Sequence, residues 1–342
     1  HLGARASSGF SLWLDGRELL DFATHDHETF TRTAPVELHA GRLYDVRLDY
    51  INAGRDPKVQ LLWAIAGQDH AAAALEAAQK AEVVVMVMGL SPSLEGEEMP
   101  VHVEGFAGGD RTKIDLPATQ EALLRQIHAT GKPVVLVLMG GSALAVNWAQ
   151  AHVPAILHAW YPGEEGGTAI ADVLFGDANP GGRLPVTFYR SVEQLPSFDD
   201  YDMAGRTYRY MTEEPLYPFG FGKSYTAFEY SDLQVSPSRM GSGGAVQVAV
   251  DVLNAGEVAG DEVVQLYISY KDSAVSRPVK ELKGFERITL AAGERRVVTF
   301  TLSASQLRYW GVDGWVLEPG MVEVQVGSSS RDIRVAGEVE VG

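Results

Sequence analysis

The sequence has no cysteine, which excludes a disulfide framework, a thiolate zinc site and a cysteine nucleophile. Basic residues are also scarce, because 28 Lys and Arg against 45 Asp and Glu give a formal net charge of −17. Such a charge works against binding to nucleic acid or anionic lipid. The longest apolar runs, residues 83–90 and 134–139, are far shorter than the roughly 20 residues of a membrane-spanning helix. We therefore expect no nucleic-acid partner and no membrane insertion.

The 342 residues, 46% of them apolar and 21% charged, have the balance of a globular protein and the length of two to three domains. Residues 10–65 are expected to be all β, because apolar and polar side chains alternate between turns. Asp15-Gly16 indicates a hairpin, and further strands are expected around residues 36–38, 44–50 and 59–65. So few strands hardly form a stable sheet alone, and we expect part of this domain to precede His1.

From residue 69 to about 188 the pattern changes to alternating strands and helices, which predicts a parallel sheet covered by helices. The expected strands are residues 83–89, 133–139 and 155–160, and the expected helices are residues 71–81, 117–129, 142–150 and 166–175. Ligands of such sheets bind at the carboxyl ends of the strands, so the loops after Gly89, Met139 and Trp160 are the places to search. From about residue 228, short strands return, clearest at 246–253, 262–270, 297–302 and 322–326, and predict a β-sandwich.

The loop from Leu90 to Gly109 is long and acidic, and it follows the first buried strand of the α/β region. It contains four glutamates: Glu95, Glu97, Glu98 and Glu104. A carboxylic acid there could protonate a leaving oxygen if burial or a neighbouring carboxylate raised its pKa. A solvated acidic loop without chemistry is the alternative interpretation.

Three other patterns are weaker candidates for chemistry. Ser142 follows a strand as a hydrolase nucleophile does, but Leu144 stands where the G-x-S-x-G turn needs glycine, so we expect Ser142 to be a helix N-cap. The Gly-rich turn at residues 163–167 carries Glu164 and Glu165, which would repel phosphate, so it indicates close helix packing. Two His and two acidic residues form a cluster that favours a polar loop over a metal site: His25, Asp26, His27 and Glu28.

Aromatic side chains concentrate near the carboxyl edge of the α/β region and its exit. They are Trp160, Tyr161, Tyr208, Tyr210, Tyr217, Phe219 and Phe221. Aromatic faces stack on sugar rings, and they also pack the seams between domains. Both interpretations stay open at this point.

Several motifs, in order along the chain, resemble glycoside hydrolase family 3. Those of its α/β-sandwich domain are Asp110-Arg111, Leu116-Pro117, Trp160-Tyr161-Pro162-Gly163, Ala171-Asp172-Val173-Leu174-Phe175-Gly176 and Asn179-Pro180-Gly181-Gly182-Arg183-Leu184-Pro185. The stretch from Tyr217 to Tyr225 resembles the exit from that domain, and Glu262 to Tyr267 with Arg277 to Phe285 resembles the fibronectin type III-like domain of the family. Residues 12–63 are similar to the protective antigen-like β domain that some members insert before the acidic loop.

The resemblance implies a multidomain protein that combines α/β and all-β folds. The expected domains are the C-terminal part of a protective antigen-like β domain (1–67), the α/β sandwich domain with the acid/base loop (68–225) and the fibronectin type III-like β-sandwich (226–342).

The family also implies a function. Its members are retaining β-glycosidases, mostly β-glucosidases and β-xylosidases, which act on terminal, non-reducing sugars of β-linked oligosaccharides or glycosides without cofactor or metal. An aspartate on an N-terminal (β/α)8 barrel is their nucleophile, and a glutamate of the second domain is the general acid and then the general base. Glu95-Gly96-Glu97 matches the Glu-x-Glu element of relatives, which implies that Glu97 is the acid/base, with Glu98 and Glu95 as the alternatives.

No segment resembles the barrel strand that carries the nucleophile, so we expect the barrel to come from the same precursor or from a second chain. The family implies a secreted or periplasmic protein, and a homo-oligomer is compatible with the sequence. The sequence names neither the sugar nor the residues that bind it. A carbohydrate-binding module without catalysis is the alternative function, whereas a nucleotide-binding enzyme is disfavoured because GxGxxG and P-loop motifs are absent from the sequence.

Overall fold

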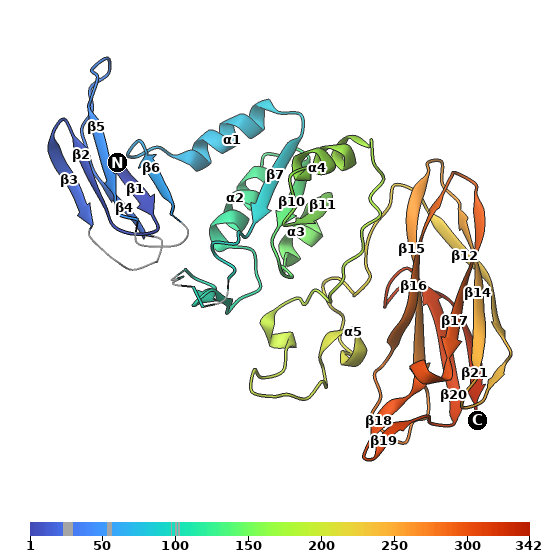
Figure 1. The fold of residues 1–342 in the computed structure, drawn as a ribbon. Coiled ribbons are helices and arrows are strands. Elements are labelled where there is room, and N and C mark those ends of the chain that lie inside the picture. Colours follow the sequence, from blue (N-terminus) through green and yellow to red (C-terminus); the bar gives the residue numbers. More distant parts are fainter. Residues whose placement is uncertain (23–29, 53–56, 97, 100, 102) are drawn as a thin grey trace. The chain divides into compact units, whose positions relative to one another are not determined.

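The computed structural model describes residues 1–342 apart from 23–29, 53–56, 97, 100 and 102, and it divides into two compact units, His1–Ala81 and Glu82–Gly342 (Figure 1). Two predicted features lie outside the described residues: Glu97 and the cluster from His25 to Glu28. Each unit is described by itself below. The predicted domain boundaries at 67/68 and 225/226 stay predictions.

The first unit contains two antiparallel sheets of three strands each. Their strand orders are β4(Phe30–Ala34)-β1(Leu2–Ala6)-β6(Val59–Trp63) and β3(Arg17–Phe22)-β2(Phe10–Leu14)-β5(Val46–Tyr50). The predicted hairpin is present as β2 and β3, and Ala4, Ala6 and Phe10 are fully buried in a small core. The strand expected at residues 36–38 is absent from this described stretch, because Pro35 cannot donate to a ladder and β4 ends before it.

Helix α1 (His70–Lys80) closes the first unit. The Asp69 side chain caps it by accepting a hydrogen bond of 2.9 Å from the Ala72 N–H, as expected for an acidic N-cap residue. The alanine-rich pattern predicted this helix with its first residue shifted by one.

The second unit begins with a parallel sheet of three strands in the order β11(Ala155–Trp160)-β10(Val134–Met139)-β7(Val84–Gly89). Helices α2 (Ala118–His128) and α3 (Asn147–His152) connect its strands, and α4 (Gly166–Phe175) follows β11 (Figure 1). The central strand is the most apolar, and Val134, Leu136 and Val137 are fully buried. Its continuous apolar run is the pattern expected of a buried parallel strand.

Glycine at the end of β7 is required by a close approach of the central strand. Gly89 has φ +129°, and a Cβ there would lie 1.8 Å from the Met139 carbonyl oxygen. Gln120 of α2 brackets this residue, accepting a hydrogen bond from the Gly89 N–H (2.7 Å) and donating one to the Gly89 carbonyl (2.8 Å). The acidic loop therefore leaves the sheet at a residue that is held by β10 on one side and by Gln120 on the other.

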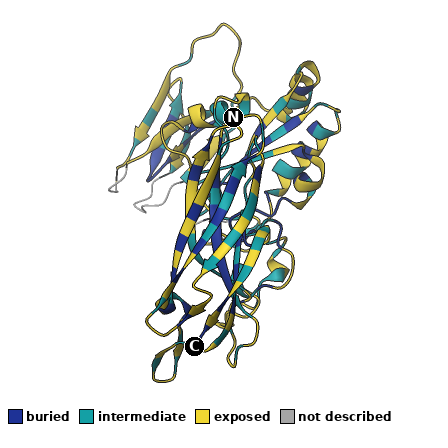
Figure 2. Cartoon of the chain, turned by 90° about the vertical axis from the view of Figure 1, so that its right-hand side faces the viewer, coloured by how far each residue is buried: buried dark blue, intermediate teal, exposed yellow. Residues whose placement is uncertain are grey.

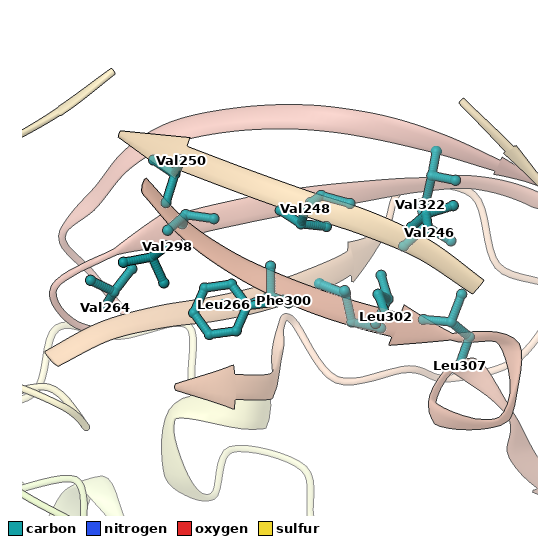
Figure 3. Close-up of a cluster of buried hydrophobic side chains, with 14 of the residues drawn as sticks. Val246, Val248, Val250, Val264, Leu266, Val298, Phe300, Leu302, Leu307 and Val322 are labelled. Atoms are coloured by element: carbon teal, nitrogen blue, oxygen red, sulfur yellow. The ribbon is translucent and has the colours of Figure 1, made fainter. Parts of the chain in front are cut away.

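After the irregular stretch that carries η1 (Val192–Gln194) and α5 (Thr207–Tyr210), the chain forms the predicted β-sandwich. One sheet is β12(Phe228–Ser236)-β14(Ala245–Asn254)-β17(Arg295–Ser303), and the other is β13(Arg239–Met240)-β21(Ile333–Val341)-β20(Gly320–Gly327)-β15(Gly260–Tyr270)-β16(Glu281–Leu290). Buried and exposed residues alternate along these strands, which Figure 2 shows by colour. Val248 and Val250 of one sheet and Val264 of the other contribute to the core between them (Figure 3).

The α/β region and the sandwich contact each other through polar and aromatic side chains. Arg183 and Glu262 of β15 form an ion pair of 2.8 Å in which both side chains are almost fully buried, 8% and 5% exposed. The Tyr208 ring stacks on Phe219 and meets Tyr267 of β15 edge-on. For Tyr208 and Phe219, the structure therefore favours packing over sugar stacking.

Candidate active site

Three loops at the carboxyl edge of the parallel sheet meet at the carboxylate of Glu95. Oε2 accepts hydrogen bonds from the Gly141 N–H (2.8 Å) and the Tyr161 hydroxyl (2.7 Å), and Oε1 accepts one from the Ser142 hydroxyl. Glu95 belongs to the loop after β7, Gly141 and Ser142 follow β10, and Tyr161 follows β11. The edge that the sequence predicted to carry the site is thus the edge at which these loops converge.

Arg111 joins this arrangement from the short strand β9 (Asp110–Arg111), which pairs with β8 (Phe106–Ala107). Its Nη1 donates to the Ser142 Oγ (2.8 Å) and to the Ala143 carbonyl (2.6 Å). Glu95, Arg111, Gly141, Ser142 and Tyr161 are called the Glu95 network below. The chain directly after the acidic loop is therefore held at the same strand ends as Glu95.

The prediction that Ser142 is a helix N-cap is wrong. Helix α3 begins at Asn147 with Val146 at the N-cap position, so Ser142 lies outside the helix. Its hydroxyl donates to Glu95 and accepts from Arg111. Both hydrogen bonds join residues more than 30 positions apart, and local sequence cannot reveal them.

Ionisation of Glu95 is favoured by its neighbours. Partial burial opposes the charge, but hydrogen bonds from Ser142, Tyr161 and Gly141, together with the positive charge of Arg111, lower its pKa below the ordinary value. Burial and the hydrogen bond to Glu95 raise the pKa of Tyr161 to about 12, so Tyr161 remains a protonated donor. At neutral pH Glu95 is therefore a carboxylate acceptor and a poor source of a proton.

The remaining predicted acids differ from Glu95. Glu98 is exposed and has a left-handed backbone with φ 50°. Glu104 is exposed and pairs with Lys113 at 2.6 Å. Glu97 lies outside the described residues. Of the described glutamates in this loop, Glu95 lies at the strand ends, whereas Glu98 and Glu104 lie at the surface.

Glycines make the acidic loop compact around Glu95. Gly109 has φ +91°, and a Cβ there would lie 1.5 Å from the Gly96 carbonyl oxygen. The Met99 N–H donates to the Gly108 carbonyl (2.7 Å) within the same loop. The backbone next to Glu95 thus packs directly on the turn that precedes Arg111.

In the turn at residues 163–167, a Cβ on Gly166 would lie 2.5 Å from the Pro162 Cβ, whereas a Cβ on Gly163 or Gly167 would meet no atom within 4 Å. Close helix packing at this turn stays a prediction. The described residues contain no group of three or more His, Asp or Glu side chains suited to hold a metal ion. In the part of the chain that the structure describes, no helix combines the length and apolar character needed to cross a membrane.

A half-buried histidine with two buried ring nitrogens lies on β11, three residues before Tyr161. His158 of β11 packs edge-on against Trp160 (ring centroids 4.4 Å apart) and Phe188 (5.3 Å), and neither ring nitrogen has a hydrogen-bond partner among the described residues. Burial lowers its pKa from 6.5 to about 4. At neutral pH the imidazole is therefore uncharged.

This histidine predicts a pH dependence of stability. The unfolded chain takes up the imidazole proton at higher pH than the folded chain, so stability falls as the pH drops from about 6.5 toward about 4. The His158→Phe variant lacks this titration. Its melting temperature is therefore expected to fall less between pH 7 and pH 5 than that of the unmodified protein. Thermal unfolding at both pH values measures the difference, and equal losses in the two proteins would contradict the prediction.

Comparison with known proteins identifies the family. The model of the glycosyl hydrolase family 3 C-terminal domain matches residues 9–225, and that of the fibronectin type III-like domain matches residues 262–330. The first match covers more than half of the chain, so the chain belongs to glycoside hydrolase family 3. It contains the α/β domain of the family followed by a fibronectin type III-like β domain, and the resemblance seen in the sequence is confirmed.

Relatives include both β-xylosidases and β-glucosidases. The chain is similar to a xylan 1,4-beta-xylosidase of Xylanibacter ruminicola (46% identity over 73% of this chain and 29% of that protein). It is also similar to a periplasmic beta-glucosidase of Salmonella typhimurium (42% identity over 76% of this chain and 34% of that protein). The chain therefore spans about a third of the length of these curated relatives.

A solved structure matches the entire chain. The crystal structure of a beta-glucosidase from Kluyveromyces marxianus in complex with glucose superposes with a TM-score of 0.83 at 32% identity, covering 100% of this chain and 42% of that one. That enzyme thus contains a counterpart of both units described above.

Proposed function

We propose that this chain is the acid/base-bearing part of a retaining β-glycosidase that hydrolyses terminal, non-reducing β-D-glycosidic bonds. The observation that carries the proposal is that three strand-end loops of a family 3 domain, one of them the acidic loop, meet at Glu95. A β-glucosidase is favoured and a β-xylosidase comes next, because the structure that matches the whole chain is that of a β-glucosidase.

In the proposed mechanism, Glu97 protonates the glycosidic oxygen and then removes a proton from the attacking water. A barrel aspartate attacks the anomeric carbon, and the leaving alcohol departs with the proton of Glu97. The barrel comes from the same precursor or from a second chain, and in a retaining enzyme the two carboxyl groups lie about 5–5.5 Å apart. Glu95 is ill suited to the acid role because the hydrogen bonds from Gly141, Ser142 and Tyr161 hold its carboxylate in the ionised form. Of the two glutamates in the Glu-x-Glu element, we therefore propose Glu97 as the acid/base.

The finer domain description is also proposed. Residues 1–67 form the C-terminal part of a protective antigen-like β domain, which the whole-chain match to the Kluyveromyces marxianus enzyme supports. Residues 68–225 and 226–342 are the α/β sandwich domain and the fibronectin type III-like domain. A secreted or periplasmic location is proposed, supported by the periplasmic relative from Salmonella typhimurium.

One experiment tests the proposed function and its need for a barrel. The active material is purified, its intact mass is measured, and it is assayed on nitrophenyl β-glucoside and nitrophenyl β-xyloside. We expect hydrolysis, with β-glucoside preferred, only when a barrel accompanies the chain. Full activity of material that contains nothing but a 37.0 kDa chain would contradict the division of the site. Sugar retention without hydrolysis would instead favour a carbohydrate-binding module.

A further inference from the structure

We propose that Glu95 is a positioning residue, whose carboxylate joins the acidic loop to the ends of β10 and β11 and thereby fixes the acid/base glutamate. This inference rests on the proposed function and deepens it. The contacts that carry it are the hydrogen bonds from Gly141, Ser142 and Tyr161 to the two carboxylate oxygens. Glu97 follows Glu95 by two residues, a span of at most about 7 Å of backbone.

The hydrogen bonds of the Glu95 side chain are those of an ionised acceptor and differ from those that a general acid needs. Three donors converge on one carboxylate, and a carboxylate that accepts several hydrogen bonds is held in its ionised form. Arg111 holds one of these donors in place, since it donates to the Ser142 hydroxyl and also to the neighbouring Ala143 carbonyl. Glu95 thus has the surroundings of a fixed acceptor.

The strand ends are shaped to receive this carboxylate. A Cβ on Gly141 would lie 2.9 Å from the Tyr161 ring and 3.4 Å from the Glu95 Oε2, so only glycine lets these groups come together. Trp160, directly before Tyr161, has a left-handed backbone with φ 57°, at the place where the register of β10 and β11 shifts. Strained backbone of this kind persists where the surroundings enforce it, and it clusters at functional sites.

A role in global stability alone is disfavoured by where the network lies. Glu95 is half-buried and Tyr161 is exposed, and neither belongs to the hydrophobic core. The hydrogen bonds join loops at one sheet edge, so their loss is expected to free the acidic loop and leave the sheet itself in place. The expected consequence is a misplaced acid in a folded protein.

The test uses the complete enzyme and four variants: Glu95→Gln, Tyr161→Phe, Glu97→Gln and Glu104→Gln. Glu95→Gln is expected to lower kcat/KM about 10–100-fold on a glycoside with a poor leaving group and much less on a dinitrophenyl glycoside, which needs no protonation. Azide is expected to give no rescue. Tyr161→Phe keeps the charge of Glu95 but removes one donor, and a smaller effect in the same direction is expected. Glu104→Gln changes an exposed member of the same loop and is the matched control.

The pH profile of kcat/KM is a second test, because loss of a purely structural contact is not expected to shift its basic limb. The basic limb of kcat/KM reports the apparent pKa of the acid in the free enzyme. In Glu95→Gln the loop loses its anchor and the acid loses a neighbouring negative charge, and both changes are expected to shift this limb to lower pH. Tyr161→Phe is expected to shift it less.

The outcomes distinguish the inference from the function on which it rests. If Glu97→Gln leaves turnover unchanged, the acid/base role that the proposed function gives to Glu97 fails. Suppose that Glu97→Gln abolishes turnover, while Glu95→Gln lowers kcat/KM equally on both substrates and leaves the basic limb of the pH profile in place. The positioning role is then overturned. Azide rescue of Glu95→Gln, with none for Glu97→Gln, would make Glu95 the acid and would also overturn it.

Discussion

Replacing Glu97 by Gln in the complete enzyme is expected to lower kcat for a glycoside with a poor leaving group by about 10²–10⁴-fold, the usual contribution of general acid–base catalysis. Glutamine cannot donate the proton that the departing oxygen needs. Dinitrophenolate leaves a dinitrophenyl glycoside without this proton, so formation of the glycosyl-enzyme stays fast. Hydrolysis of the glycosyl-enzyme becomes slow, because the general base is missing. A burst of dinitrophenol followed by a slow steady state is the expected measurement.

Glu98→Gln is the control for this prediction, because it removes a carboxylate next in the chain that is exposed in the structure. We expect it to keep near-normal turnover on both substrates. If Glu98→Gln shows the burst and Glu97→Gln does not, the acid/base role belongs to Glu98.

The second large effect is expected on stability. Arg183→Met leaves the Glu262 carboxylate buried without its partner, and breaking a buried pair in this way costs about 3–5 kcal/mol of the free energy of unfolding. Urea unfolding of the purified chain measures the change. Arg287→Met, which breaks the more exposed pair with Asp261 next to Glu262, is expected to cost only about 0–1 kcal/mol.

The cost of Arg183→Met is also expected to depend on pH. Burial already raises the pKa of Glu262 although Arg183 opposes this, and removing Arg183 raises that pKa further. The folded variant therefore binds a proton at a pH where its unfolded chain does not, and its stability falls as the pH rises through this window. The loss relative to the unmodified protein is expected to be larger at pH 7 than at pH 4.5.

A double substitution separates charge burial from packing. In Arg183→Met combined with Glu262→Met no buried charge remains, so most of the lost stability is expected to return. Equal losses in the single and double variants would show that the contact between the α/β region and the sandwich, rather than the unpaired carboxylate, decides the stability.

Much of the fold was predictable because its signals are local. The apolar run of β10, the Asp69 cap of α1 and the alternation along β14 each follow from neighbouring residues. The carboxyl edge of the sheet was also predictable, because parallel strands place the loops after Gly89, Met139 and Trp160 at one edge.

The contacts inside the site were not predictable in the same way. Tyr161 was identified only as one of several aromatic residues, and Ser142 was interpreted as a helix cap, whereas both donate to Glu95 across 66 and 47 positions. Periodicity does not encode such long-range hydrogen bonds. The Gly140-Gly141-Ser142 sequence after a strand was the available signal, since glycine there permits the close approach of Tyr161 to Glu95.

Product analysis of the Glu97→Gln variant in azide tests most directly whether Glu97 is the acid/base that works together with a nucleophile on another stretch of polypeptide. Azide is expected to attack the anomeric carbon of the accumulated glycosyl-enzyme, releasing the barrel carboxylate and forming the β-glycosyl azide, which NMR identifies. Recovery of free sugar alone at an unchanged rate, with no glycosyl azide, would contradict the role assigned to Glu97.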